Sequence, residues 1–160
     1  MKSIRLQWRS QSGLTLAELM IVMAIIATLA AIAVPIIADV TERARVARAI
    51  ADIKILESEI AVFEVLNGRL PADLAEIGRG GTRDAWGNAY EYLNFAALDT
   101  NGKDKGKVRK DHNLHPLNST YDLYSKGRDG ESQAPLTAHA SRDDIIRAND
   151  GGYVGLASNY

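Results

Sequence analysis

The sequence predicts an α+β protein in which a long N-terminal α-helix, transmembrane in its first half, packs on a small antiparallel β-sheet head. Three observations predict this fold. An apolar run covers residues 14–38, and apolar residues recur at helical spacing after it. From Arg69 onward, short apolar and aromatic groups alternate with Gly, Asn, Asp and Pro, which is typical of strands and turns.

Composition limits the classes of function. A chain of 160 residues has room for one folding unit and an appendage. Its 19 basic and 20 acidic residues give a net charge of −1, which argues against nucleic acid as the main partner. The absence of cysteine excludes a thiolate nucleophile, a Cys-based zinc site and any disulfide.

The apolar run is long enough to cross a bilayer as a helix, which needs about 20 residues. A secretory signal peptide is cut after its apolar run, behind small residues. Here the break from polar to apolar sequence, at Gly13 and Leu14, comes before the run, so we expect the apolar segment to stay in the mature protein. The residues before the break include no acid and three bases, Lys2, Arg5 and Arg9.

The helix is predicted to continue through Pro35 to Asn67, because no Gly and no second Pro interrupts it before Gly68. Pro35 removes one backbone hydrogen bond, which predicts a kink. Beyond Pro35 one face of the helix is apolar and the opposite face is polar, as in a helix that packs on a domain. The apolar positions are Val46, Ile50, Ile53, Leu56, Ile60 and Phe63.

In the head, strands are expected within residues 85–93 and 121–124. Residues 99–112 are polar and are expected to form a turn or an exposed loop. After Gly130 the sequence has too little periodicity for a strand or helix to be assigned.

Glu18 is the only ionisable residue in the apolar run. A carboxylate in a membrane segment is costly and usually has a partner. If the chain is cut after Gly13, the new α-amine of Leu14 is the nearest candidate, in the same subunit or in a neighbour whose register it would set. The alternative is a single-span anchor whose Glu18 lies near the membrane surface and stays solvated or protonated.

Residues 12–19, Ser-Gly-Leu-Thr-Leu-Ala-Glu-Leu, resemble the type IV prepilin signature, with Gly before the cut and Glu at the fifth mature position. The resemblance implies that a prepilin peptidase cuts after Gly13 and N-methylates Leu14. It also implies that Glu18, and Pro35 at the 22nd mature position, serve the assembly of a homopolymer. The family most often has Phe at the position of Leu14. Leu14 departs from this pattern, but it is also apolar.

Three head motifs, residues 67–71 (NGRLP), 84–90 (DAWGNAY) and 121–130 (YDLYSKGRDG), resemble the major pseudopilin of type II secretion systems. The resemblance implies a structural subunit, not an enzyme, of a periplasmic pseudopilus that helps to drive folded proteins through an outer-membrane secretin. One alternative is a type IV pilin of a surface filament for adhesion, motility or DNA uptake. Another is a monomeric membrane-anchored periplasmic enzyme or binding module.

The resemblance also implies an organisation and a location. Residues 1–13 would be a cleaved leader, 14–38 the transmembrane and polymerisation helix, 39–67 an amphipathic helix on the head, and 68–160 a β-rich head. The chain would cross the inner membrane once, with the head in the periplasm. Its partners would be further copies of itself, minor pseudopilins, the prepilin peptidase and an inner-membrane assembly platform.

Major pseudopilins bind calcium after the DLYS motif, and the resemblance extends this site to four residues. Asp129 matches a side-chain ligand, Lys126 a backbone ligand, and Asp143 with Asp144 the paired acids. The segment 132–141 lengthens the gap between them relative to the family. The alternative is an ordinary turn at Asp129 and solvated or helix-capping acids at 143 and 144.

Other candidates are weaker. Asp99, Asn101 and Asp104 resemble the start of an EF-hand loop but lack its Gly and its final acid, so we expect a turn. Trp86 is expected to anchor the core of the head. The histidines are too scattered for a metal site and are expected at the surface; they are His112, His115 and His139.

Overall fold

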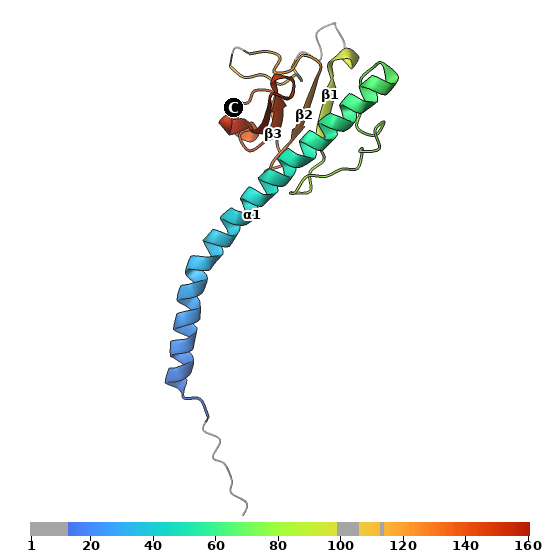
Figure 1. Ribbon diagram of the computed structural model, residues 1–160. Coiled ribbons are helices and arrows are strands. Elements are labelled where there is room, and N and C mark those ends of the chain that lie inside the picture. The colour runs from blue at the N-terminus through green and yellow to red at the C-terminus, as the bar shows by residue number, and fades with distance from the viewer. Residues whose placement is uncertain (1–12, 99–105, 113) are drawn as a thin grey trace, which may run out of the picture. The chain divides into compact units, whose positions relative to one another are not determined.

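The computed structural model describes residues 13–98, 106–112 and 114–160 (Figure 1). The leader bases and the cluster from Asp99 to Asp104 lie outside the described residues. A long helix, α1, extends over Leu16–Asn67, and the strands are β1 (Glu91–Asn94), β2 (Tyr121–Ser125), β3 (Ile145–Ala148) and β4 (Tyr153–Leu156). Short 3-10 helices cover Phe95–Ala97, His139–Ser141, Asn149–Gly151 and Ala157–Asn159.

The chain divides into two compact units, Met1–Val40 and Thr41–Tyr160. The described part of the first unit is essentially the first half of α1, and α1 is long and apolar enough to cross a membrane. The helix continues through Pro35 as predicted, although this residue has no N–H to donate to the turn before it. The kink at Pro35 stays a prediction.

In the second unit, residues of α1 that recur at the predicted helical spacing form part of the core. Ala49, Ile53, Leu56 and Ile60 recur at steps of four and three, and all are buried. The side chains they meet come from the head: Leu74, Tyr90, Tyr121, Leu123 and Ile145. The helix ends as predicted, because Gly68 has a φ of +69° and its N–H donates to the Glu64 carbonyl at 2.8 Å.

The sheet is an antiparallel meander in the order β1-β2-β3-β4. Figure 1 shows the second half of α1 lying along this sheet. Successive residues of β3 point to opposite faces. Ile145 packs in the cluster under α1, and Ile146 packs in a second cluster with Leu117, Leu136, Ala148 and Ala157. The sheet is therefore covered on both faces, by α1 on one and by loops and the C-terminal residues on the other.

Three expectations for the head need correction. The first predicted strand begins only at Glu91, because the residues before it form a turn. The segment 99–112 is not an exposed loop throughout, since Val108 and Arg109 are buried. The unassigned sequence after Gly130 contains the hairpin of β3 and β4, which turns at Asn149–Gly151.

Candidate functional site

The start of α1 is closed by a reciprocal pair of side chains. The backbone N–H and the hydroxyl of Thr15 both donate to Oε2 of Glu18 at 2.8 Å. The Glu18 N–H donates back to the Thr15 hydroxyl at 3.3 Å. This is a capping box, which satisfies N–H groups that have no partner inside the helix. The spacing Thr-Leu-Ala-Glu carries the signature of a capping box, and the sequence analysis missed it.

The predicted cleavage site lies just before this cap. Leu14 is 73% exposed, and a Cβ added to Gly13 would meet nothing within 4 Å. In the uncut chain the Leu14 nitrogen belongs to a peptide bond, so it has no charged amine to offer to Glu18. The pairing of Glu18 with a Leu14 α-amine therefore stays a prediction, and Thr15 is the partner that Glu18 has in the single chain.

The first half of α1 has no covering within its own chain. Every residue from Gly13 to Thr41 is exposed, including large apolar side chains such as Met20, Ile26 and Ile32. A contiguous apolar surface of this size marks a membrane segment or an interface with other molecules. This surface, with Glu18 at its beginning, is the candidate assembly site.

Two of the three head motifs that resemble pseudopilins are bonded to each other. Asp84 is buried, and its Oδ1 accepts the backbone N–H groups of Trp86 at 3.0 Å and Asn88 at 2.8 Å. Its Oδ2 accepts the hydroxyl of Ser125, at the end of β2, at 2.5 Å. The Asp84 carboxylate thus folds the DAWGN turn and fixes it to the DLYSKG segment.

We call this contact between the DAWGN turn and the DLYSKG segment the motif junction, and two further hydrogen bonds complete it. Asn88 donates from Nδ2 to the Gly127 carbonyl at 2.8 Å, and the Gly127 N–H donates to the Ser125 hydroxyl at 3.1 Å. Gly130 comes so close that an added Cβ would lie 3.2 Å from Oδ1 of Asn88. Sequence analysis selected the two motifs separately, and the structure places them in direct contact.

Trp86 and the histidines lie where they were expected. Trp86 packs against the core cluster and donates from Nε1 to Oε1 of Glu42 on α1 at 3.2 Å. His112, His115 and His139 are all exposed.

Three of the predicted calcium residues lie together. The Asp129 N–H donates to Oδ2 of Asp143 at 2.9 Å. Gly127, next to Lys126, approaches the Asp143 carbonyl so closely that a Cβ has no room there. The segment 132–141 therefore does not separate the two ends of the predicted site. Oδ1 of Asp129 accepts the Glu131 N–H at 2.8 Å, which fits the alternative of an ordinary turn.

Asp144 has a different environment. Its side chain is fully buried, and its Oδ2 accepts Nη2 of Arg109 at 2.5 Å and the Ser132 hydroxyl at 2.7 Å. Burial raises the pKa of Asp144 to about 6, while the neighbouring Arg109 guanidinium opposes this shift.

These placements fit a calcium ion poorly. Calcium takes six to eight oxygen ligands. Within residues 13–98, 106–112 and 114–160, no three His, Asp or Glu side chains are grouped closely enough to hold a metal. The calcium site at Lys126, Asp129, Asp143 and Asp144 stays a prediction.

The motif junction predicts the effect of one hydroxyl. Ser125→Ala removes a donor to Asp84 and an acceptor for Gly127, and leaves both groups buried without that partner. We expect the free energy of unfolding of the full chain in detergent to fall by about 1–3 kcal/mol. Ser58→Ala, an exposed helix position, is the matched control and should change it by less than about 0.5 kcal/mol. Equal effects in urea titrations of the two variants would contradict the junction.

Comparisons with known proteins agree with this geometry. Residues 8–34 match the family described as prokaryotic N-terminal methylation motif. The type IV major pilin protein PilE of Neisseria gonorrhoeae is 30% identical over 150 residues, which cover 91% of this chain and 87% of that protein. Type II secretion system core protein G of Pseudomonas aeruginosa is 29% identical over 147 residues, covering 79% of this chain and 89% of that protein. Its namesake in Dickeya chrysanthemi is also 29% identical over 147 residues, with 89% and 90% covered. No match to a solved structure was found.

The similarities extend over the apolar helix and the head together. The methylation motif spans the predicted cut at Gly13 and the capped start of α1. The pilin and secretion relatives each cover most of both chains. The chain therefore belongs to the type IV prepilin-like family and is a pilin-like structural subunit.

Proposed function

We propose that this subunit polymerises through the first half of α1 into a periplasmic pseudopilus that helps to drive type II protein secretion. The observation that carries the proposal is the motif junction in the head. Two of the three motifs with a pseudopilin pattern, around Asp84 and Ser125, share one buried hydrogen-bond network. Several relatives that cover most of the chain are type II secretion core G proteins.

The proposal includes a location and a processing step. The chain crosses the inner membrane once, with residues 14–38 in the bilayer and the head in the periplasm. A prepilin peptidase cuts after Gly13 and methylates Leu14. The subunit is not an enzyme, and it works with an assembly platform and minor pseudopilins.

In this proposal the Glu18 carboxylate carries a negative charge during assembly. Its partner in the single chain, Thr15, supplies neutral donors, which leave such a charge uncompensated. Cutting after Gly13 creates a positive α-amine at Leu14. In the low-dielectric interior of a membrane, opposite charges attract far more strongly than in water. A new subunit is therefore recruited when its amine meets Glu18 of its neighbour, and this contact sets the axial register.

A surface type IV pilin is the second candidate, because pilin relatives match the chain over the same length. Deleting the gene in the native host separates the two. We expect folded exoproteins to accumulate in the periplasm while surface filaments remain, with secretion restored by the gene on a plasmid. Loss of surface filaments with unchanged secretion would identify a type IV pilin and contradict the proposal.

A membrane-anchored periplasmic module that works without polymerising is the third candidate. It requires that the subunit act as a monomer, so a variant that is processed but unable to assemble would complement the deletion fully. The Glu18 variant described below provides this test.

Cleavage after Gly13 predicts that a larger residue there blocks processing. Gly13→Leu has free space in the structure, so a defect would report recognition by the peptidase rather than misfolding. We expect the unprocessed chain to accumulate, with no methylated Leu14, when intact mass is measured in membranes. Leu14→Phe, the residue most common in the family, is the control and should be processed. Normal maturation of Gly13→Leu would place the cut elsewhere.

The assembly role of Glu18 can be separated from its capping role. Glu18→Gln can still complete a capping box but carries no charge. We expect this variant to be processed and to remain monomeric in chemical crosslinking by a reagent that does not require cysteine. We also expect it to fail to complement the gene deletion. Thr15→Ala removes the cap, costs about 1 kcal/mol of helix stability, and should still polymerise. Polymers of Glu18→Gln at the native level would show that the charge is not required.

A further inference from the structure

A buried ion pair lies outside the motif junction and has no role in the function proposed above. Nη2 of Arg109 is 2.5 Å from Oδ2 of Asp144, and the two side chains are 3% and 0% exposed. The hydroxyl of Ser132 contacts both groups, accepting from Nη1 of Arg109 at 2.5 Å and donating to Oδ2 of Asp144 at 2.7 Å. A charged pair with so little exposure is expensive to bury and very costly to break.

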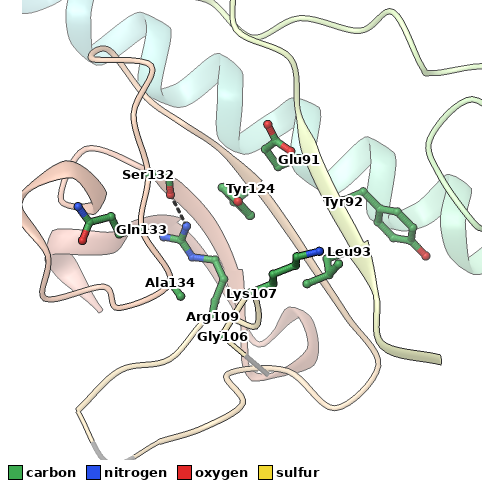
Figure 2. A pocket seen from close by; sticks show the side chains of 10 residues that line it. All are labelled: Glu91, Tyr92, Leu93, Gly106, Lys107, Arg109, Tyr124, Ser132, Gln133 and Ala134. Atoms are coloured by element: carbon green, nitrogen blue, oxygen red, sulfur yellow. Dashed lines mark hydrogen bonds between the residues drawn. The ribbon is translucent and has the colours of Figure 1, made fainter. Parts of the chain in front are cut away.

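Arg109 is held at both its backbone and its side chain. Its backbone N–H donates to Oδ2 of Asp122 at 2.8 Å, and Asn118 donates to the other oxygen of this carboxylate at 2.9 Å. The guanidinium carbon lies 4.2 Å from the ring centre of Tyr124, in a cation–π contact. Figure 2 shows the Arg109 guanidinium bonded to Ser132, with Tyr124 nearby. These three residues line a cavity of about 300 Å³.

Two segments that are far apart in the sequence meet beside the pair. Arg109 comes from the polar stretch between β1 and β2, and Ser132 begins the segment that lengthens the gap before Asp143. The two segments share backbone hydrogen bonds on either side of Lys110. Its N–H donates to the Ala134 carbonyl at 3.0 Å, and its carbonyl accepts the Leu136 N–H at 2.9 Å. The longer loop is thus docked on the stretch that carries Arg109.

We propose that the guanidinium of Arg109 is the cation that holds the loop of residues 126–144 in place, where the pseudopilin resemblance implies a divalent metal. The head then folds without calcium. The positive charge beside Asp144 repels a metal ion from the one acid of the predicted site that is fully buried, and the Asp143 carboxylate already accepts the Asp129 N–H. This inference does not depend on which kind of filament the subunit forms.

The remaining polar atoms of the pair agree with this assignment. Among the described residues, the buried side-chain atoms without a hydrogen-bond partner are Nε of Arg109 and Oδ1 of Asp144. These are the atoms that a second, parallel bond between the same two groups uses in a side-on pair. One carboxylate oxygen without a partner is far short of a calcium shell.

The first test uses the unaltered full chain in detergent. We expect the same Tm in excess chelator and in millimolar calcium, and no heat of binding when calcium is titrated into the chelator-treated protein. A Tm that falls in chelator and returns with calcium would overturn the proposal. This arm requires no variant, so it decides the question even where a substitution prevents folding.

The second test removes the guanidinium. Arg109→Gln should lower the Tm by about 10 °C, because Asp144 is left buried without a cation. Lys110→Gln, an exposed neighbour on the same segment, is the control and should stay within about 2 °C of the native protein. Adding Asp144→Asn to Arg109→Gln should recover part of the loss, since the unpaired charge is then gone. An Arg109→Gln chain as stable as the control would contradict the assignment.

Discussion

The head depends on one buried face of α1, from Ala49 to Ile60. These side chains are the apolar contacts that the helix makes with Tyr121 and Leu123 on β2 and with Ile145 on β3. A four-stranded meander cannot bury its apolar face alone, and the helix supplies the second layer. The head packs on α1 where this buried face begins, so the start of the face sets the position of the head on the helix.

Polar networks then fix the contacts between segments that apolar packing does not determine. Hydrophobic contacts are non-directional, so they do not determine how the turn before β1 meets the end of β2. The Asp84 carboxylate determines it through its bonds to backbone N–H groups and to Ser125. Arg147 forms a second network, which joins β3 to α1. Its Nε donates to Oε1 of Glu57 at 2.7 Å, and its guanidinium carbon lies 4.2 Å from the ring centre of Tyr121. Each network ties an element to a neighbour that apolar packing has already brought close.

Sequence patterns predicted the parts of this structure that depend on local periodicity. The helix, its end before Gly68, and the strand around Leu123 follow from spacing and turn residues. The strand around Ile145 was missed because both of its faces are buried, so its residues show no alternation of apolar and polar types. The turn at residues 84–90 reads as a strand because the decisive interaction, a carboxylate capturing N–H groups, leaves the pattern of apolar residues unchanged.

The burial of Arg109 was beyond prediction for another reason. Its partner Asp144 is 35 positions away, and the residues around Arg109 are polar, as in an exposed loop. No local pattern distinguishes an arginine that faces solvent from one that reaches a distant carboxylate. The same limit applies to the motif junction, whose members Asp84 and Ser125 are 41 positions apart. Local sequence indicates which residues are polar, and only the fold decides which of them become partners.

Glu18 and Asp144 show how the type of partner decides what a carboxylate does. Asp144 faces a cation from its own chain, so its charge is neutralised within the subunit and the contact stabilises one fold. Among the described residues, Glu18 accepts hydrogen bonds from Thr15, whose neutral donors orient the carboxylate and cap the helix without compensating a charge on it. A carboxylate that keeps its charge in an apolar surrounding attracts a cation from outside the chain. Asp144 is thus paired within its own chain, whereas Glu18, which is exposed in the single chain, is the carboxylate for which we propose a partner in a neighbouring subunit.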